Sequence, residues 1–569
     1  MTAWSPLDIA DRAANVLAPE SGLLADPDVA QFGKALGRAL VAAGTNPAGL
    51  IGAYARLATD LARIPAATLA RWVGMSVEPP LAVNPKDRRF ADQAWSDNPA
   101  FFAVRQAYLA LSRLSRDVIG AANLAPSAEG KARLAADLLL DALSPTNFLP
   151  TNPAAIKRAF DTGGVSLVRG ARHFVDDLLH NNGRPRQVDT SPFRLGESLA
   201  ATPAKVVYRN QLMELLQYEP QTERVHAAPL LCSPPWINKY YVMDLAPGRS
   251  FIEWAVKHNH TVFAISYRNP SAEMAGVTMD DYLVHGPKQA LDVIEEITGA
   301  ETIDIVGLCL GGALTAITDA YLTEIGDGRV GNLTLLNTLL DYTEPGALKL
   351  FTDQGTVDRL EKQMARTGHL EGKSMAGTFD VMRANDLIFN YVVSNWLMGQ
   401  DPPAFDILAW NADSTRMPAA MHAFYLRNFY LENRLAQGTM RIAGQRIDLS
   451  DIKKNTYVVS AENDHIVPWR SAYATTRLLS GPVRFVLSSG GHIAGIVNPP
   501  GPKGWYLTGE ELPATAAQWR AASVRHAGSW WEDWAAWSAE HSGELVDPPR
   551  MGSDNHPVLG EGPGDYIRT

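Results

Sequence analysis

The sequence predicts an α/β protein whose core is a mostly parallel sheet covered by helices on both faces. From about residue 205 onward, short apolar segments alternate with stretches of helical spacing, which is typical of strand–helix–strand units. One of these segments also runs directly into a turn bracketed by glycines, and a helical pattern follows it. The apolar segments that we interpret as strands are 229–232, 261–267, 303–306, 333–336, 457–460 and 484–487.

Residues 1–200 form a different region. They are rich in Ala and Leu, and segments 29–41 and 130–143 place apolar residues at helical spacing. We therefore expect an N-terminal mainly helical domain, whose helices serve packing rather than chemistry.

Residues 201–545 are expected to form the sheet domain, with an insertion at about 340–445 where the alternation stops. The insertion is dense in Trp, Tyr, Phe, Asn and Met, and we interpret it as a cap or lid. Near the end of the domain, Trp530, Trp534 and Trp537 share one helical stripe and are expected to pack into the core. Residues 546–569 contain Pro, Gly and Asp and are expected to be a flexible C-terminal tail.

Composition excludes several classes of function. The chain has 569 residues and a net charge of −10, which argues against nonspecific binding to nucleic acid. It contains 2 cysteines, too few for a disulfide framework. No apolar run approaches the roughly 20 residues of a membrane span, and the N-terminus lacks the layout of a signal peptide. We therefore expect a cytoplasmic protein without a transmembrane segment.

The turn after 303–306 reads Gly-Leu-Cys309-Leu-Gly-Gly, a strand–turn–helix pattern with cysteine at the position of a nucleophile. Gly307 and Gly311 allow the strand and helix to approach closely. The N-terminus of the following helix favours a thiolate. A buried structural cysteine is the alternative interpretation, and the turn by itself does not decide between the two.

An acid and a base follow in the order expected of an α/β-hydrolase fold. Asp464 comes after the strand at 457–460, and His492 comes after the strand at 484–487. Ligands of open α/β sheets bind at the carboxyl ends of the strands, where all three residues fall. We therefore predict Cys309, Asp464 and His492 as a catalytic triad. His465 is a rival base, but it directly adjoins the acid, and we favour His492.

Two backbone amides are candidates for an oxyanion hole. Leu310 supplies the first because it opens the helix after the nucleophile. The second is expected from the loop after 229–232, at Trp236 or Ile237. Asp304 and Cys232 are interpreted as structural. The chain shows no phosphate-binding glycine loop and no cysteine–histidine cluster spaced for a metal, so no cofactor and no metal are expected.

Several longer segments resemble the polyhydroxyalkanoate synthases, which are members of the α/β-hydrolase superfamily. The resemblance runs from about residue 85 to about residue 540 and includes the turn around Cys309. The other matching segments are 87–99, 234–241, 385–391, 405–411, 463–469 and 490–500. The length of the chain and its own N-terminal region are similar to the single-subunit types of this family.

The resemblance implies polymerisation of (R)-3-hydroxyacyl-CoA into a polyester with release of CoA. It implies Cys309 as the acyl carrier, His492 as the base and Asp464 as its acidic partner, with the CoA thioester as substrate rather than cofactor. It further implies a homodimer at the surface of an intracellular polyester granule, in contact with the growing chain and with phasin-like granule proteins. The preference for short or medium side chains stays open.

Two other functions compete with this interpretation. A cysteine-dependent thioesterase or esterase would use the same residues and pass the acyl group to water. A catalytically silent protein that binds granules would not need the triad at all. Thioester chemistry favours the synthase, because attack by a thiolate on a thioester keeps the acyl group activated for the next hydroxyl.

Overall fold

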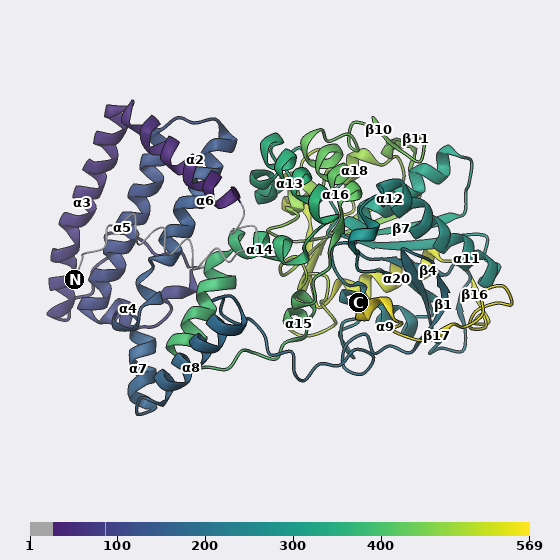
Figure 1. Ribbon diagram of the computed structural model, residues 1–569, viewed down its shortest axis with the longest axis horizontal. Coiled ribbons are helices and arrows are strands. Elements are labelled where there is room, and N and C mark those ends of the chain that lie inside the picture. Colours follow the sequence, from purple (N-terminus) through teal and green to yellow (C-terminus); the bar gives the residue numbers. More distant parts are fainter. Residues whose placement is uncertain (1–26, 86) are drawn as a thin grey trace. The chain divides into compact units, whose positions relative to one another are not determined.

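The computed structural model describes residues 27–85 and 87–569, and the chain divides into two compact units (Figure 1). One unit contains the described residues up to Asp189 together with Lys373–Ala404. The other contains Thr190–Gly372 and Phe405–Thr569. We call them the helical unit and the sheet unit. The expectations for residues 1–26 lie outside the described residues.

The helical unit is built from helices in the region where the sequence predicts them. Three of them begin at an Asn-Pro pair, where the side chain of Asn46, Asn98 or Asn152 accepts a hydrogen bond from a free amide and proline occupies the first turn. Its helices are α2 (Pro27–Gly44), α3 (Pro47–Trp72), α4 (Ala94–Asp97), α5 (Pro99–Ala121), α6 (Pro126–Ala142), α7 (Pro153–Asp161) and α8 (Val165–His180), followed by α14 (Gly372–Met382) and the π-helical turns Asn385–Phe389 and Val392–Leu397.

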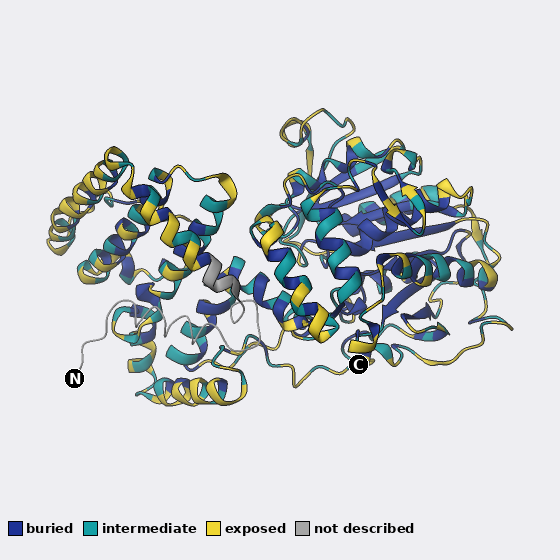
Figure 2. Cartoon of the chain, turned by 45° about the horizontal axis from the view of Figure 1, so that its top comes forward, coloured by how far each residue is buried: buried dark blue, intermediate teal, exposed yellow. Residues whose placement is uncertain are grey.

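Within the described residues, the sheet unit contains an 11-stranded sheet in the order β15-β14-β13-β12-β7-β6-β4-β5-β2-β1-β17. The strands predicted from the sequence form its centre, and each of them is parallel to its neighbours there. Figure 2 shows these strands in the colour of buried residues. They are β4 (Leu230–Ser233), β5 (Val262–Tyr267), β6 (Ile303–Leu308), β7 (Val330–Leu336), β12 (Thr456–Ala461) and β13 (Val483–Ser488).

The strands of this sheet that were not predicted from the sequence are antiparallel and lie toward its two edges. In these strands the apolar and polar residues alternate less regularly, or the strand is short, and β15 is largely exposed. None of them therefore shows the continuous apolar run that is typical of a buried parallel strand. They are β1 (Ala204–Arg209), β2 (Met213–Tyr218), β14 (Trp505–Thr508), β15 (Val524–Ala527) and β17 (Gly560–Glu561).

Helices cover both faces of this sheet, as predicted. On β6, a Cβ at Gly307 would lie 2.5 Å from Thr315 of α12 (Leu310–Glu324), so this face packs against α12. Asp304 points to the opposite face because successive strand residues alternate. There it accepts a hydrogen bond of 2.6 Å from Ser542, directly after α20 (Trp530–His541). Of the predicted core stripe, Trp530 and Trp534 of α20 are buried, whereas Trp537 is half-buried.

Two segments differ from the sequence-based boundaries. Residues 373–404, which lie within the predicted cap at about 340–445, belong to the helical unit. There Trp396 donates a hydrogen bond of 2.8 Å to Asp177 of α8. Residues 546–569, expected to be flexible, pair with β1 through β17, and Ile567 is buried. Both differences depend on long-range contacts that local composition does not reveal.

Candidate active site

Cys309 stands at the junction of β6 and α12 in a strained backbone conformation. Its φ is 52° and its ψ is −114°, a region that side-chain-bearing residues rarely occupy. The Cys309 amide donates to the Leu336 carbonyl at 2.8 Å, which anchors the turn to β7. A Cβ at Gly311 would lie 2.1 Å from the carbonyl oxygen of Ser233. The glycine pattern around Cys309 is therefore a steric requirement of this turn.

The predicted acid and base are hydrogen-bonded to each other. Nδ1 of His492 lies 2.7 Å from Oδ2 of Asp464, whose side chain is fully buried. The other oxygen, Oδ1, accepts hydrogen bonds from the amides of Ile466 and Val467 at 2.8 and 2.9 Å. These amides hold the carboxylate in place, so it can orient the imidazole.

Cys309 and His492 also interact with each other. Burial by itself would lower the pKa of His492, but the charges of Asp464 and Cys309 and the hydrogen bonds to both raise it to about 10. An imidazole with this pKa carries its proton at neutral pH, next to the sulfur. The structure thus brings the three predicted residues together in the geometry of a nucleophile, a base and an acid. The histidine that is hydrogen-bonded to the Asp464 carboxylate is His492, the base that the sequence analysis favours.

Asn337, which the sequence analysis missed, connects this group to the sheet. Its side-chain amide donates a short hydrogen bond to the main-chain carbonyl of His492, and its own backbone amide donates to Val459 of β12 at 2.8 Å. It has a φ of 42°, in the left-handed region that asparagine tolerates better than most residues. Asn337 could have been found from the sequence, because it is a polar residue directly after a predicted strand and therefore at the same edge of the sheet as Cys309.

Three tyrosine side chains lie within electrostatic range of Cys309. The pKa values of Tyr342, Tyr425 and Tyr430 are raised, first by burial and further by the charge of Cys309, so their hydroxyls lie within its electrostatic reach. Their rings pack edge to face, with centroids 4.9 Å apart for Tyr342 and Tyr430. Cys309 itself is only 9% exposed. These tyrosines come from the parts of the predicted insertion that belong to the sheet unit.

The two oxyanion candidates lie on the segments that flank Cys309. Leu310 is the first residue of α12 and is buried. Ile237 belongs to the loop after β4. Where this loop begins, Ser233 and Pro234 are the residues nearest Gly311 in the turn around Cys309, which we call the elbow. In the same loop, Trp236 is buried and packs its ring against Tyr425. The donor role of Leu310 and Ile237 stays a prediction.

Asp304 and Cys232, which the sequence analysis interprets as structural, are both buried. Asp304 lies toward the start of β6 and accepts hydrogen bonds from Asn332 and Ser542. Cys232 is buried within β4, and this burial raises the pKa of its thiol far above the usual range.

Comparison with known proteins identifies the family. An alpha/beta hydrolase fold family matches residues 216–499, and a family described as the N-terminus of poly-beta-hydroxybutyrate polymerase (PhaC) matches residues 86–255. A poly(3-hydroxyalkanoate) polymerase of Methylorubrum extorquens is 40% identical over 568 residues, which cover 99% of this chain and 94% of the relative. The chain belongs to the poly(3-hydroxyalkanoate) polymerase family.

Two further members of the family show the same relationship. The polymerase subunit PhaC of Rhizobium meliloti is 43% identical over 88% of this chain and 83% of its own length. The corresponding subunit of Cupriavidus necator is 40% identical over 88% of this chain and 86% of its own length. The predicted family and α/β-hydrolase fold are confirmed, and the chain is an acyl-transferring enzyme. Among residues 27–85 and 87–569, no helix combines the length and apolar character needed to cross a membrane.

Proposed function

We propose that this polymerase joins (R)-3-hydroxyacyl-CoA units into a polyester through a covalent thioester on Cys309, with release of CoA. The observation that carries the proposal is the contact of His492 with both Cys309 and Asp464 at the end of β6. A cysteine suits the reaction because the exchange of one thioester for another is nearly neutral in free energy. Acyl transfer involves no net oxidation or reduction, so the proposed reaction needs no cofactor besides the CoA of the substrate.

In the first half-reaction, Cys309 takes up the acyl group. His492 already holds the proton that the thiol has given up, and the Cys309 thiolate attacks the carbonyl carbon of the acyl-CoA thioester. The carbonyl oxygen becomes an oxyanion, which the amides of Leu310 and Ile237 are proposed to stabilise. When the bond to the CoA sulfur breaks, His492 returns the proton and CoA leaves as a thiol. Asp464 stabilises the imidazolium throughout.

In the second half-reaction, the 3-hydroxyl of the next hydroxyacyl-CoA attacks the thioester on Cys309. An alcohol is a poor nucleophile at neutral pH, so His492 removes its proton as the oxygen–carbon bond forms. The carbon–sulfur bond then breaks and Cys309 is regenerated, while the chain, one unit longer, is carried by the incoming CoA. A further attack by Cys309 transfers the chain back to the enzyme and releases this CoA.

Water competes with the hydroxyl for the thioester, so the site must exclude it. The burial of Cys309, together with that of Tyr342 and Tyr425 near it, supports this role. We propose that the insertion which supplies them acts as a cap that opens for substrate and closes for chemistry.

The product also suggests where the enzyme acts. A polyester is insoluble in water, and we propose that the polymerase works in the cytoplasm at the surface of polyester granules, as a homodimer, alongside phasin-like granule proteins. The rates of CoA release with short and medium (R)-3-hydroxyacyl-CoAs measure which side-chain length the polymerase prefers.

The test is an assay of the purified full-length chain with (R)-3-hydroxyacyl-CoAs of short and medium chain length. We expect release of CoA together with turbid, extractable polymer. Free hydroxy acid in place of polymer would instead identify a thioesterase. We expect Cys309→Ala to abolish CoA release and His492→Ala nearly to do so. Unchanged CoA release from Cys309→Ala would overturn the covalent mechanism.

A further inference from the structure

One asparagine side chain connects the beginning of the cap insertion to a segment near its end. Asn433 lies shortly after the π-helical turn Leu426–Leu431. Its Oδ1 accepts a hydrogen bond from the amide of Tyr342 at 2.9 Å, and its Nδ2 donates to Oδ1 of Asp341 at 2.8 Å and to Oγ1 of Thr343 at 3.1 Å. These three partners are consecutive residues at the point where the insertion leaves the sheet. Asn433 therefore ties that point to the π-helical turn.

Both the hydrogen bonds and the backbone of Asn433 favour asparagine at this position. An amide accepts with its oxygen and donates with its nitrogen at the same time, whereas a carboxylate only accepts. Burial would raise the pKa of Asp341, but the hydrogen bonds from Thr343 and Asn433 lower it below its ordinary value. Asn433 thus donates to a charged acceptor, which makes a stronger bond than a neutral one. It also has a φ of 49°, which asparagine tolerates better than most residues.

The beginning of the insertion carries Tyr342, which packs against the π-helical turn. The centroid of its ring lies 5.4 Å from that of Phe429 and 4.9 Å from that of Tyr430, and both contacts are edge to face. Tyr425 ends the preceding helix α16 (Ala419–Tyr425), and its ring lies 5.5 Å from that of Tyr430. A π-helical turn bonds residues five positions apart, so it brings these two tyrosines to the same side. We call Tyr342, Tyr425, Phe429 and Tyr430 the aromatic cluster.

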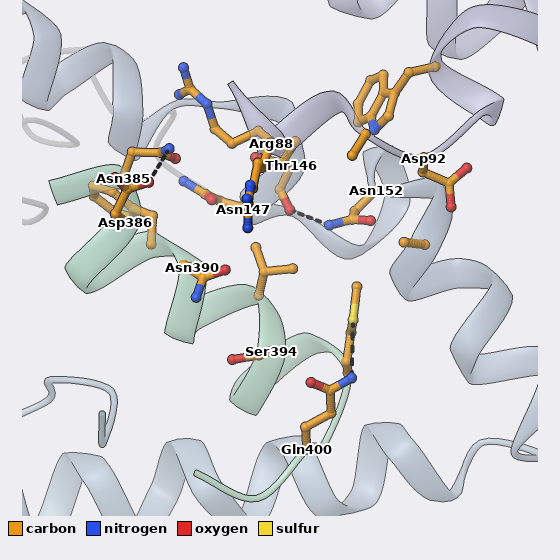
Figure 3. Close-up of a pocket in the computed structure, with 17 residues that line it drawn as sticks. Arg88, Asp92, Thr146, Asn147, Asn152, Asn385, Asp386, Asn390, Ser394 and Gln400 are labelled. Atoms are coloured by element: carbon orange, nitrogen blue, oxygen red, sulfur yellow. Dashed lines mark hydrogen bonds between the residues drawn. The ribbon is translucent and has the colours of Figure 1, made fainter. Parts of the chain in front are cut away.

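The helical unit also contains π-helical turns, and they border a different kind of space. There the turns Asn385–Phe389 and Val392–Leu397 line a pocket with a volume of about 480 Å³. Figure 3 shows the polar side chains of Asn390 and Ser394 along this wall. In the sheet unit, by contrast, the turn Leu426–Leu431 presents rings that are packed against one another. This second arrangement is suited to closing a space rather than to lining one.

The aromatic cluster lies within electrostatic range of Cys309. Burial is the main cause of the raised pKa values of its three tyrosines, and the charge of Cys309 raises them further. Tyr342 is 3% exposed and Tyr425 is 5% exposed. Closely packed rings exclude water, provided that Tyr342 and the π-helical turn stay together. Asn433 makes the polar link that keeps them together.

We propose that Asn433 is a positioning residue that protects the acyl group on Cys309 from water. The proposal rests on the proposed function, which supplies the thioester. With Tyr342 held against the π-helical turn, the thioester meets the 3-hydroxyl of the next unit rather than a water molecule. Without this link, water adds its oxygen to the carbonyl carbon and gives a proton to His492. The carbon–sulfur bond then breaks, Cys309 is regenerated, and the acyl group leaves as a free acid.

Asn433→Gly tests this role, because glycine accepts the positive φ and only the side chain is lost. The probe is butyryl-CoA, which lacks a 3-hydroxyl, so its acyl group cannot be elongated and leaves Cys309 by hydrolysis. For the parent we expect a burst of CoA release during acylation, followed by slow release. In Asn433→Gly the burst should persist, while the slow phase should become about tenfold faster, as expected for the loss of a hydrogen bond to a charged group.

Asn259→Gly is the matched control. Asn259 also has a positive φ, of 65°, but it lies before β5, at the edge of the sheet opposite to Cys309. Both phases should therefore equal those of the parent. A loss of burst and slow phase together in Asn433→Gly would show damage to the fold and would overturn the positioning role.

Alkylation of Cys309 by iodoacetamide tests the same link without any acyl group. The modified peptides are quantified by mass spectrometry, with the buried Cys232 as an internal reference. We expect Cys309 to react about tenfold faster in Asn433→Gly than in the parent, because the loosened cluster admits a small molecule. Equal alkylation and equal hydrolysis in the two proteins would overturn the proposal. If the parent shows no burst while alkylation differs as expected, the proposed function fails and the shielding of Cys309 by Asn433 stands.

Discussion

At the scale of single residues, the site combines backbone strain with a buried ion pair. A positive φ at a residue with a side chain is unfavourable by about 1–3 kcal/mol, and Cys309 adopts this conformation at the turn that presents its sulfur. Hydrogen bonds on both sides hold the turn: the Cys309 amide to Leu336, and the Gly312 amide to the Cys309 carbonyl. The same arrangement places the sulfur beside His492, whose proton is held by Asp464.

The raised pKa of His492 predicts a pH-dependent contribution to stability. Its pKa rises on folding from 6.5 to about 10, so the protonated imidazole stabilises the fold fully below pH 6.5 and this contribution is lost as pH rises toward 10. Asp464→Asn removes the main charge that raises this pKa. We expect the difference in free energy of unfolding between parent and Asp464→Asn to be largest near about pH 6 and to shrink toward about pH 10. Urea unfolding at several pH values measures it, and a difference that does not vary with pH would contradict the assignment.

Asn337 is a positioning residue, because it acts on His492 through the main chain. Asn337→Ala frees the His492 loop from β7, and a displaced base can slow turnover by up to about 100-fold. We expect kcat to fall while KM changes little, since Asn337 is not proposed to contact the substrate. Asn455→Ala, an asparagine just before the start of β12, is the matched control. If both variants lose the same stability and the same activity, the effect is structural rather than positional.

At the scale of elements, the loop after β4 is held by the C-terminal segment. Lys239 is buried, and its Nζ donates to the main-chain oxygens of Ile567 and Thr569 at 3.0 and 2.6 Å. Trp410 donates to the Lys239 carbonyl at 2.8 Å. The loop that carries Ile237 is thus fixed by two segments distant in sequence.

Lys239→Met tests this connection, since it keeps the length of the side chain but removes its donors. We expect the C-terminal segment to become accessible to carboxypeptidase and the initial rate of CoA release to fall, because the loop with the proposed oxyanion donor is no longer anchored. Lys362→Met, at an exposed position of α13 (Gln354–Thr367), should leave both measurements unchanged. A protected C-terminal segment in Lys239→Met would show that the two hydrogen bonds do not hold it.

At the scale of the whole molecule, the chain passes between the two units three times: after Asp189, Gly372 and Ala404. Within the helical unit, residues 373–404 pack closely on α8. A Cβ at Gly170 would lie 2.0 Å from the Trp396 carbonyl oxygen, and Asn395 donates to the Arg186 carbonyl at 2.7 Å. The helical unit is therefore completed by a segment that the sequence places inside the sheet domain.

This topology predicts the outcome of a single cut. With a protease site inserted directly after Asp189, cleavage separates the chain into two fragments, and the second still carries residues 373–404. We expect the fragments to elute together in size-exclusion chromatography, because that segment remains packed on α8. Trp396→Ala, which removes the hydrogen bond to Asp177, should weaken their association. Fragments of the parent that separate without denaturant would contradict the division into units.

Much of the fold was predictable because its central strands are buried on both faces. Such strands need continuous apolar runs, and 303–306 and 457–460 show them directly in the sequence. The chain order of Cys309, Asp464 and His492 is also a property of the sequence, so we could name them as triad candidates before any distance was known, and the structure places them together. The edge strands, Asn337 and the tyrosines around the sulfur were not, since their roles arise from contacts between distant segments.

The local sequence specifies the elbow around Cys309, because Gly307 and Gly311 stand where any Cβ would clash, and it specifies the central parallel strands through their continuous apolar runs. Only the folded chain reveals that Asn337 bonds to the His492 carbonyl, that residues 373–404 complete the helical unit, and that the C-terminal segment anchors Lys239. The physical reason is the same in each case: steric and hydrophobic requirements are local and leave a pattern in the chain. A hydrogen bond between residues that are 155, 219 or 328 positions apart leaves none.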